Sequence, residues 1–144
     1  MDLSIDLNNT ILYIRVAVLI KGQNGYILEK HPDGYAFLVG GKIQLNETSE
    51  QAAKRELKEE LDFEVKNLKF KSIIENIYKK PSGQEVHELC FLYETEDVYA
   101  SSLSDMFIEI TNENKDSIDI KPIIIREFMG GNGDIHVVYG NNLR

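Results

Sequence analysis

The stretch GKIQLNETSEQAAKRELKEELDF, residues Gly41–Phe63, decides the fold of this 144-residue chain. Thr48 and Gln51 have the spacing of a capping box, in which two side chains satisfy free backbone N–H groups at a helix start. Two alanines follow, and every later residue up to Leu61 favours helix. The pattern therefore predicts a helix over Thr48–Leu61.

This predicted helix carries a group of acidic side chains. Glu56, Glu59 and Glu60 lie at i, i+3 and i+4, where side chains meet on a helix surface and like charges destabilise by a few tenths of a kcal/mol per pair. A hard divalent cation such as Mg²⁺ or Mn²⁺ turns this destabilisation into stabilisation, because it takes carboxylate oxygens as ligands. Taken alone, the helix still favours a plainer interpretation, a solvated face on which Lys54 and Lys58 pair with the acids.

The wider spacing changes that interpretation. The fixed positions are Gly41, five residues, Glu47, seven residues, Arg55-Glu56-Leu57, one residue, Glu59-Glu60, one residue, Asp62-Phe63. This order resembles the Nudix box, G-x5-E-x7-R-E-U-x-E-E-x-G-U with U an apolar residue, at eight of its nine specified positions and without insertions.

Two departures from the family pattern touch no carboxylate. Asp62 stands at the final glycine, but Asp is among the few other residue types that adopt left-handed backbone geometry, so the helix is still expected to end there. Val39 stands before the diglycine Gly40-Gly41, where many family members have proline.

The resemblance implies roles for particular residues. It makes Arg55, Glu56, Glu59 and Glu60 catalytic, and it makes the three glutamates, together with a loop carbonyl at Gly41, ligands of one or more Mg²⁺ or Mn²⁺ ions. It gives Gly41, Glu47 and Arg55 structural roles within the box, with Arg55 bridging to Glu47 and clamping the loop against the helix.

The general base is left open by the sequence. In related enzymes it is a box glutamate or an acid on a later strand or loop, and Glu88 and Glu94 are candidates, as are Glu96 and Asp97. His87 and Glu88 are neighbours on a predicted strand and face opposite sides, so at most one points toward the box helix. For His87 the favoured interpretation is a structural or surface role.

The flanking sequence predicts an α+β fold, a Nudix-like mixed β-sheet sandwiched between helices. Ile11–Ile20 predicts a buried strand, and Asn24-Gly25 predicts a tight hairpin turn with positive φ at both positions. Further strands are expected at Tyr26–Glu29, Tyr35–Val39, Val65–Tyr78, Val86–Glu94, Phe107–Thr111 and Asp134–Tyr139. A second helix is expected at Pro122–Met129, ended by Gly130-Gly131.

Composition excludes several classes of protein. With 42% apolar residues the chain is expected to fold as a single domain over residues 1–144, and one cysteine, Cys90, excludes a disulfide framework. The three histidines are scattered, which excludes a zinc finger. A formal charge of -8 argues against nucleic-acid binding, so an anionic ligand would need a cation as mediator.

No membrane partner is expected, because the longest apolar run, Ile11–Ile20, is about half a bilayer span and contains Arg15. The polar, acidic segment Met1–Thr10 does not resemble a secretory signal, so a cytoplasmic location is expected.

The substrate that the resemblance implies is a small molecule, a nucleoside diphosphate linked to another moiety, cleaved at its diphosphate linkage by water. An aromatic side chain would stack on the base; the candidates are Tyr26, Tyr35, Phe37, Tyr78 and Tyr93. The alternative is a Nudix-fold module that senses a nucleotide without turnover, but such modules usually lose box carboxylates and this chain keeps all four. Homodimerisation stays open, with Ile123–Ile125 as a weak hint of an interface.

Overall fold

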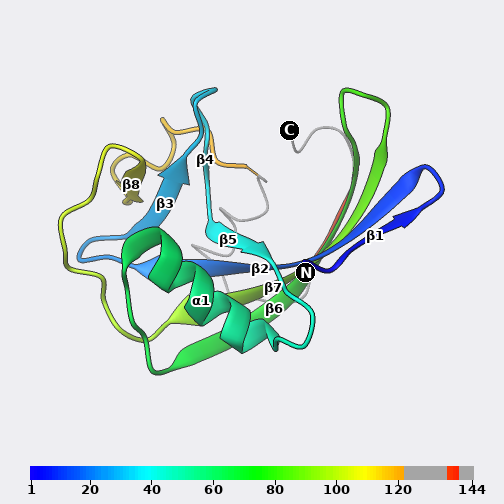
Figure 1. Cartoon of the computed structure of the whole chain (residues 1–144). Coiled ribbons are helices and arrows are strands. Elements are labelled where there is room, and N and C mark those ends of the chain that lie inside the picture. The colour runs from blue at the N-terminus through cyan, green and yellow to red at the C-terminus, as the bar shows by residue number, and fades with distance from the viewer. Residues whose placement is uncertain (122–135, 140–144) are drawn as a thin grey trace.

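The computed structural model describes residues 1–121 and the backbone of residues 136–139. These residues form a nine-stranded sheet with one helix packed on it (Figure 1). The elements in chain order are β1 (Ser4–Leu7), β2 (Thr10–Lys21), β3 (Tyr26–Lys30), β4 (Ala36–Phe37), β5 (Val39–Lys42), α1 (Ser49–Leu61), β6 (Leu68–Lys79), β7 (Glu85–Thr95), β8 (Phe107–Ile110) and β9 (His136–Tyr139).

The sheet is mixed, as the sequence predicts. Its main strand order is β4-β3-β2-β7-β6-β9, with β1 and β5 also pairing with β2, and β8 with β3. The β2–β7 and β6–β9 pairs are parallel, whereas the other pairs are antiparallel. The predicted helix Pro122–Met129, its Gly130-Gly131 end and Ile123–Ile125 lie outside the described residues.

Strand β2 lies at the centre of the sheet, and its apolar residues alternate between two cores. Val16, Val18 and Ile20 point to one face, where they pack with Ala53 and Leu57 of α1. The odd-numbered residues point to the other face, where Leu19 packs with core residues Leu28, Ile74, Leu92, Ile110 and Ile120. We call these the helix face and the far face. Each face buries its own apolar core, which holds β2 in one register.

Helix α1 begins and ends as predicted. Thr48 is the N-cap and makes both capping-box hydrogen bonds with Gln51, at 3.1 Å and 2.9 Å. Asp62 is the C-cap in left-handed geometry, with φ 52°. The helix lies against β5, β2 and β7 (Figure 1). This packing brings Glu56 of α1 beside Gly41 of β5.

The hairpin turn between β2 and β3 forms, but its predicted geometry is wrong. Neither Asn24 nor Gly25 has positive φ. The carboxylate of Glu109 instead accepts hydrogen bonds from both backbone N–H groups, each at 2.7 Å. Gly25 is needed for close approach, because a Cβ there would lie 1.9 Å from the carbonyl oxygen of Ile110.

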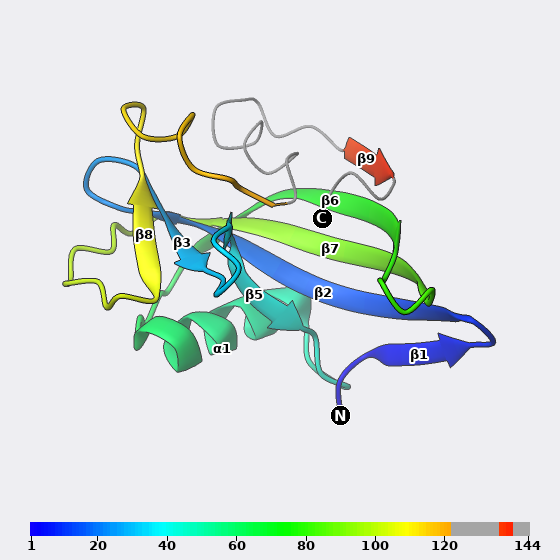
Figure 2. The ribbon, with the colours of Figure 1, turned by 90° about the horizontal axis from the view of Figure 1, so that it is seen from above.

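Strand β1 was not among the predicted strands. Leu3, Ile5 and Leu7 alternate with polar residues, which is the period of a strand, and Asn8 turns the chain with φ 58°. The β1–β2 and β6–β7 hairpins extend beyond α1 on the same side of the molecule (Figure 2). Within the described part of the chain, no helix has the length and apolar character needed to span a membrane.

Candidate active site

The two glycines in the middle of β5, Gly40 and Gly41, each leave room for a neighbour. A Cβ on Gly40 would lie 2.0 Å from the carbonyl oxygen of Val16, and a Cβ on Gly41 would lie 2.4 Å from Oε1 of Glu56. A Cβ atom essentially never comes within 3.0 Å of a heavy atom outside its own residue and its chain neighbours. Gly40 therefore allows β5 to pair with β2, and Gly41 leaves the space that the Glu56 carboxylate fills.

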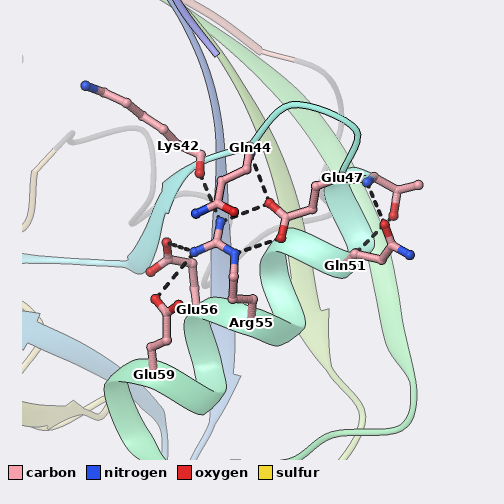
Figure 3. A network of polar contacts seen from close by, with 8 residues as sticks. Lys42, Gln44, Glu47, Gln51, Arg55, Glu56 and Glu59 are labelled. Atoms are coloured by element: carbon pink, nitrogen blue, oxygen red, sulfur yellow. Dashed lines mark hydrogen bonds and ion pairs between the residues drawn. The ribbon is translucent and has the colours of Figure 1, made fainter. Parts of the chain in front are cut away.

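Arg55 lies between the loop and the helix glutamates (Figure 3). Its Nε and Nη2 donate to the two carboxylate oxygens of Glu47 at 2.7 Å and 3.0 Å. Nη1 donates to Glu56 at 3.0 Å and to Glu59 at 3.4 Å, and Nη2 also donates to the Lys42 carbonyl at 3.2 Å. The guanidinium thus joins the end of β5, the following loop and α1, and it contains the Arg55–Glu47 bridge that the family resemblance implies.

Glu47 is held from the loop side as well. Its Oε1 accepts a hydrogen bond from the Gln44 backbone N–H at 3.0 Å, and Asn46, just before it, has positive φ of 66°. The Arg55 hydrogen bond is the main reason that the pKa of Glu47 is lowered, with the Gln44 N–H adding to it. Glu47 is therefore a fixed carboxylate rather than a free surface acid.

The helix glutamates differ in their surroundings. Glu56 is buried, at 8% exposure, whereas Glu59 and Glu60 are exposed. Burial raises the pKa of Glu56; Arg55 opposes that shift, and repulsion from Glu59 and Glu60 adds to it. The pKa of Arg55 is raised, chiefly by its hydrogen bond to Glu47.

This cluster suits a divalent cation in its donor chemistry. Glu47, Glu56 and Glu59 bring three carboxylates to one guanidinium, and Glu60 is close enough to Glu56 to repel it. Carboxylate oxygen is the ligand that Mg²⁺ and Mn²⁺ prefer. In the described part of the chain, no three His, Cys, Asp or Glu side chains already converge as a metal site. Arg55 occupies the space between Glu56 and Glu59, so a cation there would take over part of its role in balancing their charge.

A further acid, Glu29 on β3, lies near this cluster and was missed in the sequence. It is half-buried, and its pKa is raised by burial first and then by repulsion from Glu60 and Glu56. The available signal was an acid at the end of the apolar run Tyr26–Leu28. That signal did not indicate that Glu29 lies near the box glutamates, because strand β3 and helix α1 come together only through tertiary packing.

Glu88 and Glu94 lie elsewhere. Both are an even number of residues from Leu92 along β7, so their side chains lie on the same face as Leu92, the far face, away from α1. Glu88 accepts from Arg15 at 3.2 Å and from Asn76 at 3.3 Å. The structure therefore does not bring Glu88 or Glu94 together with the box glutamates.

Glu94 and His87 each have a side-chain partner within the sheet. Tyr26 donates its hydroxyl to Glu94 at 2.8 Å, and burial together with this bond raises the pKa of Tyr26 to about 12. Lys71 is 3.4 Å from the same carboxylate. His87 faces the other way and pairs with Glu75 at 2.8 Å, in agreement with the structural role favoured for it. Glu96 and Asp97 are exposed beyond the end of β7.

The aromatic candidates for stacking separate into two groups. Tyr35, Phe37 and Tyr78 line a cavity of about 550 Å³ on the far face. Tyr93 lies on the helix face, with its hydroxyl 2.6 Å from that of Ser49, and Tyr26 is engaged with Glu94.

Comparison with known proteins agrees with this geometry. The family model described as the NUDIX domain matches residues 11–112. The fold is similar to a MutT protein from Bacillus halodurans, with TM-score 0.73 and 15% identity over 92% of this chain and 93% of that one. It is also similar to a MutT protein from Methanosarcina mazei Go1, with TM-score 0.65 and 18% identity over 87% and 94% of the two chains.

A NUDIX hydrolase from Nitrosomonas europaea gives TM-score 0.57 and 19% identity over 90% of this chain and 79% of that chain. At these identities the likeness to solved structures concerns the fold. No curated protein matches the sequence.

Proposed function

This chain belongs to the Nudix family and is a Nudix-type hydrolase of phosphorus-containing anhydrides, and we propose that it cleaves the diphosphate linkage of a nucleoside diphosphate derivative with a divalent cation. The observation that carries the proposal is the place of the Glu56 carboxylate, which fills the space left open at Gly41. It brings a buried acid from α1 against the backbone of β5 at the diglycine.

In this proposal some residues of the site bind the cation and others hold the loop and the helix in place. Glu56, Glu59 and Glu60, with the carbonyl of Gly41, would hold Mg²⁺ or Mn²⁺ through oxygen atoms alone. Arg55 and Glu47 would keep the loop and the helix in register, since their two-point contact fixes both angle and distance. When bound, the cation supplies positive charge for the phosphoryl oxygens and makes water a stronger nucleophile at neutral pH.

A cation also explains how an acidic chain would accept an acidic substrate. The chain carries a formal charge of -8, and the cluster itself holds more carboxylates than cationic groups. A diphosphate approaching it alone would be repelled. We therefore expect binding of the diphosphate end to depend on the cation, whereas binding of the organic end need not.

The test is release of phosphate or nucleotide from a panel of nucleoside triphosphates, ADP-ribose, dinucleoside polyphosphates and nucleotide sugars, with and without Mg²⁺ or Mn²⁺. Glu59→Gln and Glu60→Gln remove one negative charge each from an exposed position, so neither should unfold the protein. Glu50→Gln is the matched control, because Glu50 is an exposed glutamate on the same helix that pairs with Lys54. We expect cation-dependent turnover that both box variants lose and the control keeps.

Two results would contradict the proposal. Turnover that survives in both box variants would remove the glutamates from the chemistry. Tight nucleotide binding without turnover of any member of the panel would favour the sensing module instead.

A further inference from the structure

Strand β1 is an open edge of the sheet. It pairs antiparallel with residues 10–13 of β2, and among the described residues no other strand pairs with it. Figure 2 shows β1 at the margin of the sheet, with β2 on one side of it. All four of its residues are exposed. An edge strand presents a row of unpaired backbone groups to which another strand can bind, so this edge is a candidate interaction surface.

The apolar side chains of β1 lie on one face of the sheet. Leu3, Ile5 and Leu7 alternate with polar residues, and Leu3 packs against the core of the helix face. Ile5 and Leu7 follow on the same face and have exposed fractions of 47% and 54%. Natural proteins often protect such an edge with Lys or Pro, and β1 contains neither.

The outer edge of β1 presents the backbone of the even-numbered residues. The carbonyl of Leu3 accepts a hydrogen bond from the Ile14 N–H of β2 at 3.1 Å, so the odd-numbered residues face β2. Ser4 and Asp6 therefore face outward. The Ser4 N–H already donates to the Asp2 carbonyl at 2.9 Å. Within the described chain, the Ser4 carbonyl and both backbone groups of Asp6 are left for a second strand.

A second copy of β1 fits this edge in a two-fold arrangement, and charge selects the register. Antiparallel pairing through the even-numbered residues can be centred on Ser4, Ile5 or Asp6. Centring on Asp6 places its carboxylate opposite its own copy, and centring on Ser4 places Asp6 opposite Asp2. Like charges directly opposite each other destabilise a sheet. Centring on Ile5 instead places Asp6 opposite Ser4, whose hydroxyl can donate to a carboxylate.

The register centred on Ile5 also matches apolar side chains. Ile5 then lies opposite its own copy, and Leu7 lies opposite Leu3 of the second chain. Non-hydrogen-bonded pairs of an antiparallel sheet have Cα atoms about 4.5 Å apart, so these side chains would be in contact. The side chains that β1 leaves exposed would thus be covered by a second copy. Because the same patch is used on both chains, such a contact closes as a dimer.

We propose that β1 is the interface of a two-fold dimer of this chain, in which two sheets join edge to edge with Ile5 on the axis. The occupant is a second copy because the strand is complementary to itself from Leu3 to Leu7. The interface is small, so we expect a dissociation constant on the order of 10 µM. This inference involves no residue of the box and is independent of the proposed function.

Single introduced cysteines test the register. In Ile5→Cys the two new thiols would lie at the axis, with Cα atoms about 4.5 Å apart, which is within the range for a disulfide. In Leu7→Cys the two Cα atoms would be roughly 13 Å apart, which is too far. Under mild oxidation we therefore expect a covalent dimer of Ile5→Cys and loss of cross-linking in Leu7→Cys. The wild type, whose one cysteine is Cys90, is the control and should not cross-link.

Sedimentation measures the dimer without a covalent bond. Ile5→Lys would replace an apolar pair at the axis with two opposed ammonium groups, so we expect dimerisation to weaken by at least about tenfold. Val98→Lys is the matched control, because it adds the same charge at an apolar residue of similar exposure, 51%, outside β1. It should sediment as the wild type does. Circular dichroism checks that each variant is folded.

A wild type that sediments as a monomer at about 100 µM would overturn the inference and leave the edge to a strand of another protein. Equal cross-linking of Ile5→Cys and Leu7→Cys would also overturn it, as would equal dimerisation of the wild type and folded Ile5→Lys. The box test is separate, since it reads turnover in Glu59→Gln and Glu60→Gln. Turnover without a dimer would refute this inference alone, and a dimer without turnover would refute the proposed chemistry alone.

Discussion

Arg55 holds three carboxylates and one backbone carbonyl through a single side chain. Its contacts with Glu47 use two different nitrogens, so they depend on the flat, forked shape of the guanidinium. A lysine carries the same charge at one point and cannot reproduce that geometry.

We therefore expect Arg55→Lys to lower the free energy of unfolding by about 1–3 kcal/mol, because the half-buried Glu47 and the buried Glu56 lose fixed donors. Urea unfolding measures this. Lys54→Gln, which breaks an exposed pair with Glu50 on the same helix, should cost below about 1 kcal/mol. Equal losses in the two variants would show that the fork adds nothing.

The same contact gives a pH dependence. Arg55 holds the pKa of Glu47 below its ordinary value of 4.5, so the folded state binds its proton less readily than the unfolded state. The stabilisation is therefore fully present above about 4.5 and is lost as pH falls through the lower, folded value. Urea unfolding between pH 7 and pH 3 should show a shallower acid decline in Glu47→Gln than in the wild type, with Glu50→Gln behaving as wild type.

Replacing Gly40 or Gly41 by alanine should have different effects, a loss of stability in the first case and a loss of activity in the second. In Gly40→Ala the new methyl meets the β2 backbone, which cannot move, so we expect the free energy of unfolding to fall by about 1–3 kcal/mol or more. In Gly41→Ala it meets the end of the Glu56 side chain, which can turn away. That variant should stay folded and lose activity by on the order of 100-fold, because Glu56 is displaced by about 1 Å. Thermal unfolding and kcat/KM separate the two, and a fully active Gly41→Ala would contradict the assigned place of Glu56.

Some residues of the site were predictable from sequence and others were not. The meeting of Arg55 with Glu47 and Glu56 follows from a motif within one loop and one helix. The meeting of Arg15, Asn76 and Glu88 depends on strand register, and a one-residue slip moves a side chain to the other face. The irregularity between Phe70 and Ser72 shifts the register of β6 against β7, and no local pattern announces it.

At the scale of elements, α1 was the most predictable part of the chain because its start and end signals are local. Thr48 and Gln51 close the capping box, and Asp62 takes the left-handed geometry expected at the last position of the motif. The turn at Asn24-Gly25 was misjudged because Glu109, 84 residues later than Gly25, holds it. Local signals predict elements well only where the partners are local too.

The end of α1 gives a test of that local control. Asp62→Gly should raise the free energy of unfolding by roughly 0.5–1 kcal/mol, since glycine adopts φ of 52° without strain and the exposed Lys58–Asp62 pair contributes little. Asp62→Ala should lower it by about 1 kcal/mol, because alanine is strained there. Urea unfolding decides, and the same sign of change in both variants would contradict a backbone cause.

At the scale of the whole molecule, Cys90 reports on global opening. Its side chain is half-buried on the far face, where desolvation raises the pKa of its thiol to about 12. Only the thiolate reacts readily with thiol reagents. We therefore expect labelling of the native protein at pH 8 to be slow and to accelerate in urea in step with loss of the circular dichroism signal. Rapid stoichiometric labelling without urea would contradict the packing around Cys90.

The alternation of side chains along β2 has a consequence for how such a protein can change. Val16, Val18 and Ile20 pack beneath the helix, whereas Arg15, directly before Val16 in sequence, lines the cavity on the opposite side of the sheet. Substitutions at Arg15 or Ala17 therefore change the far face without changing the residues that pack against α1. The two sides of the sheet can therefore be altered separately: randomising positions 15 and 88 together would change the lining of the far-face cavity and leave the packing beneath α1 as it is.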